Sequence, residues 1–212
     1  LKDYEYMQEF RNRDSRLYAS VLFPFKGWYE TNYGTDFIYE WIKNGNNESK
    51  TGFNFRKMSP LENDANNDGQ ATGDYPCIRY AEILLIFAEA HTQTTGFDGQ
   101  TQAALNQLRE RCGMPDVPTS LGKEEGLNLI KTERRIELAF EEHRYWDIRR
   151  WRLAEQVYAQ PIQGMYITKS QTSTTYVPQA VLNVQWDNKR YFYPIPYSEV
   201  IKNKNMVQNP NW

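Results

Sequence analysis

The stretch from residue 78 to residue 90 reads Ile-Arg-Tyr-Ala-Glu-Ile-Leu-Leu-Ile-Phe-Ala-Glu-Ala, and it predicts a helix with charges set into its packing surface. Apolar residues recur along it at helical spacing and form one broad face: Ile78, Ala81, Leu84, Leu85, Phe87 and Ala88. Arg79 and Glu82 are three residues apart and so share one side of such a helix. Residues 133–151 repeat the same mixture of alternating charges and aromatic side chains. Both stretches therefore predict a helical scaffold with internal ion pairs.

These two stretches contain seven charged residues that we expect to pair with one another across helices. A buried arginine needs a carboxylate partner, because an unpaired interior charge costs several kcal/mol. The predicted ion-pair network consists of Arg79, Glu82, Glu133, Arg134, Glu137, Arg144 and Asp147. The alternative is a paired-carboxylate active site of the glycosidase type. Each carboxylate has an arginine nearby in sequence, which lowers a carboxyl pKa and suits a structural partner better than a general acid.

Composition excludes several classes of protein. The chain of 212 residues has a net charge of −2, so no face for nucleic acid or another polyanion is implied. The two histidines, His91 and His143, form no metal-binding motif, and neither a nucleophile elbow nor a phosphate-binding glycine loop occurs. We therefore expect no catalytic residue and no enzymatic activity. Cys77 and Cys112 are expected to be buried free thiols.

The predicted fold is mostly α. A tetratricopeptide-like helical hairpin and two further helices carry an irregular loop region and a small C-terminal β-hairpin. Helices are expected at 77–93, 100–112, 120–140, 142–158 and 197–203, and strands at 166–168, 175–177 and 190–193. We expect a single domain over residues 1–212, with a loop-rich aromatic region at 1–75, a helical core at 76–160, and the hairpin and tail at 161–212.

The loop-rich region contains rings among Asn and Asp residues, a pattern that suits a sugar. The C–H face of a pyranose packs on an aromatic ring, while its hydroxyls bond to amides and carboxylates. The candidate ligand-binding residues are Trp28, Tyr29, Tyr33, Tyr39 and Trp41. The alternative is that half of these rings fill a small satellite core.

A polar loop offers a calcium-binding pattern. Asp64, Asn66 and Asp68, followed by Gly69, match the first half of an EF-hand loop, but Tyr75 stands where the bidentate Glu belongs. The alternative is an Asx-turn loop in solvent. No other cofactor is expected.

Several sequence blocks, in order along nearly the whole chain, resemble motifs of the SusD/RagB-type outer-membrane nutrient-binding proteins. The helical blocks are Arg79-x-Ala-Glu82 with Ala88-Glu89-Ala90, Asn106-x-x-Arg109-x-Arg111, Glu133-Arg134-Arg135-x-Glu137-Leu138 and Arg144-x-x-Asp147-x-x-Arg150-Trp151. The flanking blocks are Asp14-Ser15-Arg16-Leu17, Lys50-Thr51-Gly52-Phe53 with Arg56-Lys57, Pro194-Ile195-Pro196 and Gln208-Asn209-Pro210-Asn211-Trp212. His143 departs from the family, which usually has Gly there, and this leaves the local turn open.

The resemblance implies capture of a glycan or other nutrient at the cell surface without catalysis. The partner would be a SusC-like TonB-dependent transporter, which receives the oligosaccharide. The resemblance also implies an outer-membrane lipoprotein whose N-terminal part, with its lipid anchor, is absent from this chain. Two rival functions stay open at this point: a helical-repeat adaptor that binds another protein, and, less favoured, a glycoside hydrolase. The nutrient itself is open, since some family members take up peptides.

Overall fold

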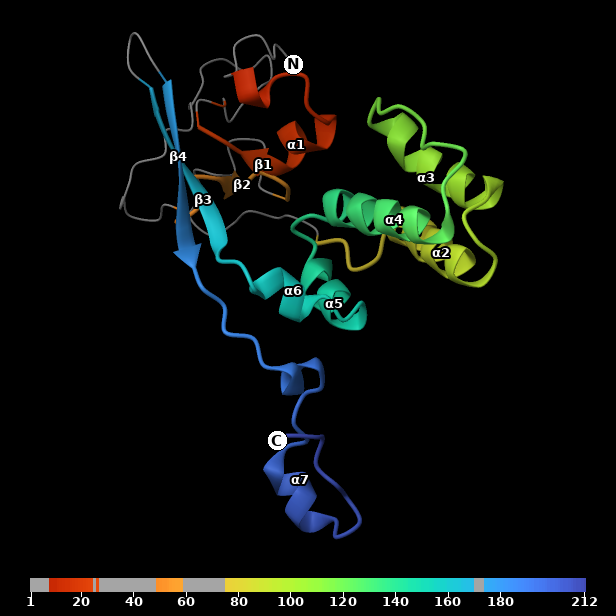
Figure 1. Cartoon of the computed structure of the whole chain (residues 1–212), viewed down its shortest axis with the longest axis vertical. Coiled ribbons are helices and arrows are strands. Elements are labelled where there is room, and N and C mark those ends of the chain that lie inside the picture. The colour runs from red at the N-terminus through yellow and green to blue at the C-terminus, as the bar shows by residue number, and fades with distance from the viewer. Residues whose placement is uncertain (1–7, 25, 27–48, 59–74, 170–173) are drawn as a thin grey trace. The chain divides into compact units, whose positions relative to one another are not determined.

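The computed structural model describes residues 8–24, 26, 49–58, 75–169 and 174–212 of the chain. The chain divides into two units, Leu1–His143 and Arg144–Trp212, called unit 1 and unit 2 below. Most regular structure in the described residues is helical, and the strands form two small antiparallel pairs (Figure 1). The predicted mostly α fold class is therefore confirmed.

Three helices form the centre of unit 1. α2 (Tyr80–Thr94) and α3 (Gly99–Arg111) make the predicted hairpin, and α4 (Lys123–Glu137) packs along α2 (Figure 1). Their shared apolar core contains Ala81, Leu84, Leu85, Ala88, Ala104, Leu105, Leu108, Val117, Ile130 and Leu138. Small alanines alternate with leucines, so the helices approach closely and interdigitate.

The apolar packing face of α2 is narrower than the face predicted for residues 78–90. Ile78 precedes α2 and is 72% exposed, and Phe87 is 41% exposed. Both assignments to the packing face were wrong. α2 begins only at Tyr80, and residue 87 lies beyond the edge of the stripe that faces α3 and α4.

Local chemistry explains where these helices begin and end. Asp98 caps α3 by accepting hydrogen bonds from the Gln100 and Thr101 amides. Gly113, at a φ of 66°, ends α3 in the left-handed conformation that glycine adopts without strain. α4 begins after Gly122, whose amide donates to the Glu125 carboxylate, so this helix starts three residues later than the predicted residue 120.

α4 also ends three residues earlier than predicted. The turn after it holds Phe140 and Glu142 at φ values of 64° and 63°. Two non-glycine residues in this conformation break the helical path before His143, which is the first residue of the next helix. The turn that the sequence left open is therefore built from strained positions that precede His143.

The N-terminal part of unit 1 consists of short helices and strands. It contains a 3-10 helix (Gln8–Phe10), α1 (Ser15–Ser20) and the antiparallel pair β1 (Val21–Leu22) with β2 (Asn54–Phe55). Phe10 stacks on Phe23 with ring centroids 4.2 Å apart. α1 carries Arg16, which is buried.

Unit 2 contains two short helices in place of one long one. α5 (His143–Arg150), whose first residue belongs to unit 1, is followed by α6 (Ala154–Tyr158), so the continuous helix predicted at 142–158 was wrong. Arg152 has a φ of 56°, and the Leu153 amide donates to the Ile148 carbonyl, which is the pattern of a Schellman motif. α5 therefore ends in a C-cap that glycine usually provides.

The remainder of unit 2 contains the predicted β-hairpin. β3 (Ile162–Lys169) pairs antiparallel with β4 (Thr174–Leu182), with an irregularity at Ile162/Gln163. The strand expected at 190–193 was wrong, because Asp187 caps a 3-10 helix (Asn188–Tyr191) there. α7 (Tyr197–Lys202) is confirmed within one residue.

Gly126 in α4 provides a test of the packing in unit 1. A Cβ there would lie 2.4 Å from Cδ2 of Phe97. Gly→Ala inside a helix normally gains about 1 kcal/mol, but overpacking costs about 1–3 kcal/mol. We expect Gly126→Ala to lower the free energy of unfolding by up to about 2 kcal/mol in urea titrations. The control is Gly99→Ala, whose Cβ meets nothing within 4 Å and should not destabilise. A Gly126→Ala protein more stable than the wild type would show that Phe97 moves away freely.

Candidate functional site

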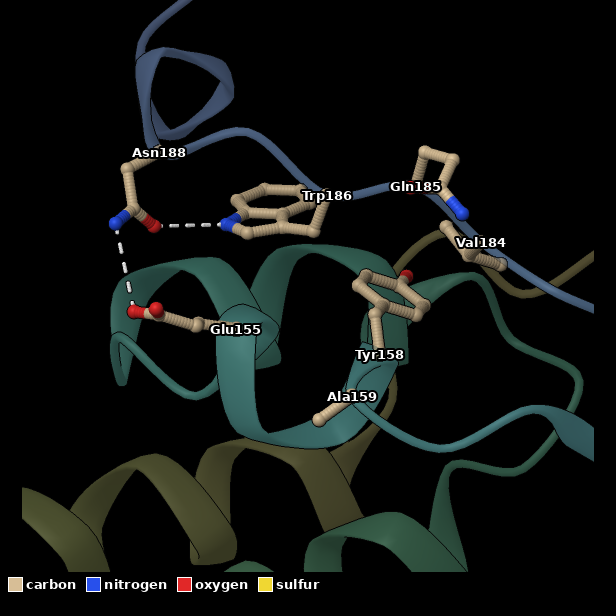
Figure 2. A pocket seen from close by; sticks show the side chains of 7 residues that line it. All are labelled: Glu155, Tyr158, Ala159, Val184, Gln185, Trp186 and Asn188. Atoms are coloured by element: carbon tan, nitrogen blue, oxygen red, sulfur yellow. Dashed lines mark hydrogen bonds between the residues drawn. The ribbon is translucent and has the colours of Figure 1, made fainter.

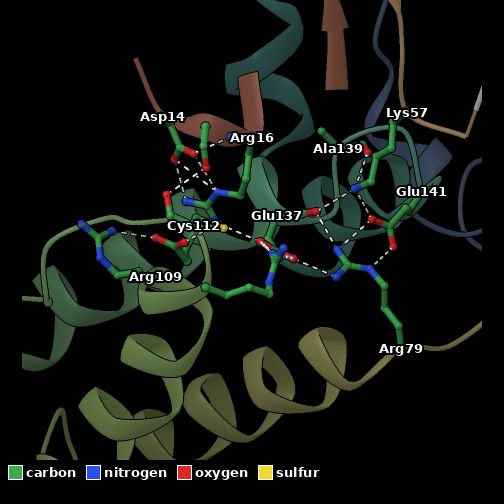
Figure 3. Close-up of polar contacts among 12 residues, drawn as sticks. Asp14, Arg16, Lys57, Arg79, Arg109, Cys112, Glu137, Ala139 and Glu141 are labelled. Atoms are coloured by element: carbon green, nitrogen blue, oxygen red, sulfur yellow. Dashed lines mark hydrogen bonds and ion pairs between the residues drawn. The ribbon is translucent and has the colours of Figure 1, made fainter. Parts of the chain in front are cut away.

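The most buried charged cluster of unit 1 is centred on Glu137, at the end of α4. Its carboxylate receives Arg16 Nη1 at 2.9 Å, Arg79 Nη1 at 2.7 Å and Arg111 Nη2 at 2.8 and 3.0 Å (Figure 3). The Glu137 side chain is 2% exposed. A carboxylate has about four acceptor sites, so this one is saturated by arginine.

Two further carboxylates extend this cluster. Glu133 bonds to Arg16 at 2.6 Å and to Arg109 at 2.8 Å. The Glu141 carboxylate accepts a bidentate pair of hydrogen bonds from Arg79, at 2.6 and 2.8 Å, and is also paired with Lys57 (Figure 3). Residues far apart in sequence, from α1 to the turn after α4, are thereby tied together.

The structure brings together only part of the predicted network. Arg79, Glu133 and Glu137 meet in the cluster around Glu137. Glu82 and Arg134 lie apart from it, 3.5 Å from each other, and His143 is 3.5 Å from the same Glu82 oxygen.

The last two predicted members belong to unit 2. Asp147 there accepts Arg150 Nε at 2.8 Å, and Arg144 lies in the same helix. Five residues of the cluster were not part of the predicted network: Arg16, Lys57, Arg109, Arg111 and Glu141. Four of these, all except Glu141, lie in blocks that resemble the nutrient-binding family, and that was the available signal.

The electrostatics of this cluster favour ionised carboxylates. Burial alone would raise the pKa of Glu137, but hydrogen bonds from Arg79 and Arg16 outweigh it and hold the pKa below its ordinary value. The pKa of Glu141 is lowered in the same way, against its burial, by Arg79 and Lys57. A general acid needs the opposite shift. These two groups are thus equipped to hold helices together and poorly equipped to donate a proton.

The lowered pKa values of Glu137 and Glu141 predict a dependence of stability on pH. Since their folded-state pKa lies below the ordinary 4.5, their contribution is complete above that value and is lost as pH falls through the folded pKa. We expect urea midpoints to fall steeply as pH drops from about 4.5. Glu137→Gln should be less stable at pH 7 and show a flatter acid limb. Identical acid limbs for both proteins would contradict this assignment.

Two sets of sequence-predicted site residues lie outside the described residues. They are the proposed sugar platform, Trp28, Tyr29, Tyr33, Tyr39 and Trp41, and the calcium pattern, Asp64, Asn66 and Asp68. Within the described ranges, no group of three or more His, Cys, Asp or Glu side chains is placed to hold a metal ion. Of the two cysteines, Cys112 is buried as expected, whereas Cys77 is exposed and that expectation was wrong.

Unit 2 contains a pocket that the sequence did not indicate. Its volume is about 370 Å³, and it lies between α6 and the segment that leads from β4 to the 3-10 helix (Figure 2). Its lining combines two aromatic rings with amide, carboxylate and small apolar side chains: Glu155, Tyr158, Ala159, Val184, Gln185, Trp186 and Asn188.

The rings of this pocket are held by their neighbours. Trp186 stacks with Tyr158, at 5.6 Å between centroids and 29° between planes. Tyr191 meets Trp186 edge-on at 4.9 Å, and the Arg149 guanidinium lies 5.2 Å from the Trp186 ring centroid. The indole is therefore oriented before any ligand arrives.

A short hydrogen-bond chain fixes the polar side of the pocket. Trp186 Nε1 donates to Asn188 Oδ1 at 3.0 Å, and Asn188 Nδ2 donates to Glu155 Oε2 at 3.4 Å (Figure 2). Within the described part of the chain, the Tyr158 hydroxyl and the Gln185 amide group have no hydrogen-bond partner. The pocket thus presents ring surface beside free donors and acceptors.

Comparison with known proteins places this architecture in a family. The family model described as the SusD family matches residues 1–212. The chain belongs to the SusD family. A SusD-like protein P2 of Formosa agariphila is 31% identical over 151 residues, which cover 68% of this chain and 27% of that protein.

Solved structures agree with this membership. A SusD-like protein from Bacteroides fragilis superposes with a TM-score of 0.79 at 26% identity, over 96% of this chain and 40% of that one. A SusD-like carbohydrate-binding protein, also from Bacteroides fragilis, gives 0.69 at 29% identity, over 98% of this chain and 44% of that one. This SusD-family chain therefore spans less than half the length of these relatives. No helix in its described ranges has the length and apolar character needed to cross a membrane.

Proposed function

We propose that this chain is part of a cell-surface protein that captures glycans for uptake. The observation that carries the proposal is the SusD-family match over all 212 residues. It is supported by the relative described as carbohydrate-binding, which aligns with 98% of the chain at 29% identity. The rings Trp28, Tyr29, Tyr33, Tyr39 and Trp41 remain candidates for ligand contact.

Binding in this proposal proceeds without catalysis. Glu137 and Glu141 are bound by arginine and lysine, and their lowered pKa values suit permanently ionised groups. Glycoside hydrolysis needs one carboxyl group that stays protonated near neutral pH. The cluster around Glu137 therefore supports a scaffold role and argues against the hydrolase alternative.

The proposed setting is the outer membrane. The protein would be lipid-anchored at the cell surface and deliver oligosaccharide to a SusC-like TonB-dependent transporter. The cellular partner would be that barrel and not a nucleic acid, in keeping with the net charge of −2.

Two experiments on the full-length protein test this function. Native electrophoresis through gels containing polysaccharide should retard the protein with at least one glycan. Affinity purification from solubilised outer membranes should recover a TonB-dependent barrel. Migration unchanged by every polysaccharide, together with a barrel in the purified sample, would support the adaptor instead.

The adaptor alternative has one structural observation in its favour. The outer face of α2 exposes Ile83 at 48%, Ile86 at 49% and Phe87 at 41%. Exposed apolar faces of this kind commonly bind protein. If the protein is an adaptor, Ile86→Glu should weaken the recovery of its protein partner. If the protein captures glycans, Ile86→Glu should leave glycan binding unchanged.

A further inference from the structure

We propose that the pocket between α6 and residues 184–188 binds one uncharged sugar unit of the captured glycan, an inference that rests on the proposed function. The candidate rings predicted from the sequence are at other positions, residues 28–41. The pocket around Trp186 is a separate candidate within unit 2.

The size and rings of the pocket suit a pyranose. Its volume of about 370 Å³ is near the lower end of small-molecule sites, which span about 300–1,000 Å³. That is room for one or two sugar rings. Trp186 and Tyr158 contribute aromatic surface of the kind against which the C–H face of a sugar packs.

The polar groups match hydroxyl chemistry. A sugar hydroxyl both donates and accepts, so it is best held where both kinds of partner are near. Glu155 offers acceptors, the Gln185 amide offers both, and the Tyr158 hydroxyl is unpartnered within the described part of the chain (Figure 2). Asn188 holds the Glu155 carboxylate in place, which limits the entropy lost when a ligand binds.

The charge of the pocket selects against anionic sugars. Among the residues that line it, Glu155 is the only charged one; the Arg149 guanidinium contacts the Trp186 ring but does not line the pocket. A sulfate or carboxylate on the sugar would be repelled by Glu155 at close range. The favoured ligand is therefore an uncharged pyranose unit.

The test uses the full-length protein and gels that contain laminarin, dextran, galactomannan or arabinoxylan. For each polysaccharide that retards the wild type, dissociation constants are compared for Trp186→Ala, Tyr158→Phe and Glu155→Gln. Tyr197→Ala is the matched control, because Tyr197 lies in unit 2, is 76% exposed and does not line the pocket. Circular dichroism melts of each variant show whether the fold is intact.

We expect Trp186→Ala to weaken binding about tenfold or more, and Tyr158→Phe and Glu155→Gln about threefold, with Tyr197→Ala unchanged. Glu155→Gln should also bind the sulfated form of the same polysaccharide more tightly than the wild type does, an effect that a structural role would not produce. Wild-type retardation with none of the three pocket variants weakened would overturn the inference and leave glycan capture standing. If Trp186→Ala unfolds, the two conservative variants decide the question. If none of the four polysaccharides retards the wild type, that result would count against both the sugar-binding pocket and the proposed glycan capture.

Discussion

Replacing Glu137 with alanine is expected to lower the free energy of unfolding by about 3–5 kcal/mol. The substitution leaves Arg16, Arg79 and Arg111 without their shared carboxylate, and Arg16 is only 7% exposed. Breaking a buried pair costs far more than removing a surface charge, because the remaining charge stays desolvated. Urea unfolding followed by circular dichroism measures the loss.

Glu110→Ala is the matched control for this prediction. Glu110 lies on the exposed side of α3, and surface substitutions of this kind usually change stability by less than about 0.5 kcal/mol. Equal urea midpoints for Glu137→Ala and Glu110→Ala would mean that the cluster around Glu137 is solvated and contributes little.

Replacing Leu105 with alanine is expected to cost about 2–5 kcal/mol. Leu105 is fully buried where α2, α3 and α4 meet, so truncation removes apolar contacts and leaves a cavity in a close-packed core. Ile83→Ala is the control, because Ile83 is 48% exposed on the outer face of α2. A Leu105→Ala protein as stable as Ile83→Ala would show that the three helices do not share one core.

Helices in this chain were predictable where a local residue marks their ends. Asp98 and Gly113 mark the start and the end of α3, whose observed range, Gly99–Arg111, lies within one residue of the predicted 100–112. Arg152 ends α5 with the same backbone geometry as Gly113, yet arginine carries no such signal. The Arg152 guanidinium lies over the Tyr191 and Phe192 rings, contacts that no local pattern indicates, so periodicity alone predicted one continuous helix at 142–158.

The partners of the buried charges could not be read from spacing. Helical periodicity relates residues three or four apart, whereas Arg16 and Glu137 are 121 residues apart. Their meeting depends on how α1 and α4 pack, which is a property of the tertiary fold. The sequence therefore identified the charged helices, including Glu82 and Arg134, which do pair across α2 and α4, but it could not say which carboxylate each arginine contacts.

The pocket around Trp186 was unpredictable for the same reason. Tyr158 and Trp186 are separated by the whole β3–β4 hairpin, and neither lies in a pattern typical of a sugar site. Rings clustered in one stretch of sequence, as at residues 28–41, can be recognised from the sequence alone. Rings brought together by a hairpin cannot be recognised in this way.

We propose that the full-length protein binds a glycan and leaves it intact. Calorimetric titration of the full-length protein with a polysaccharide that retards it, followed by chromatography of the recovered glycan, tests this most directly. We expect a saturable binding heat and an unchanged chain length of the polysaccharide. Absence of binding heat, or shortened chains with new reducing ends, would contradict it.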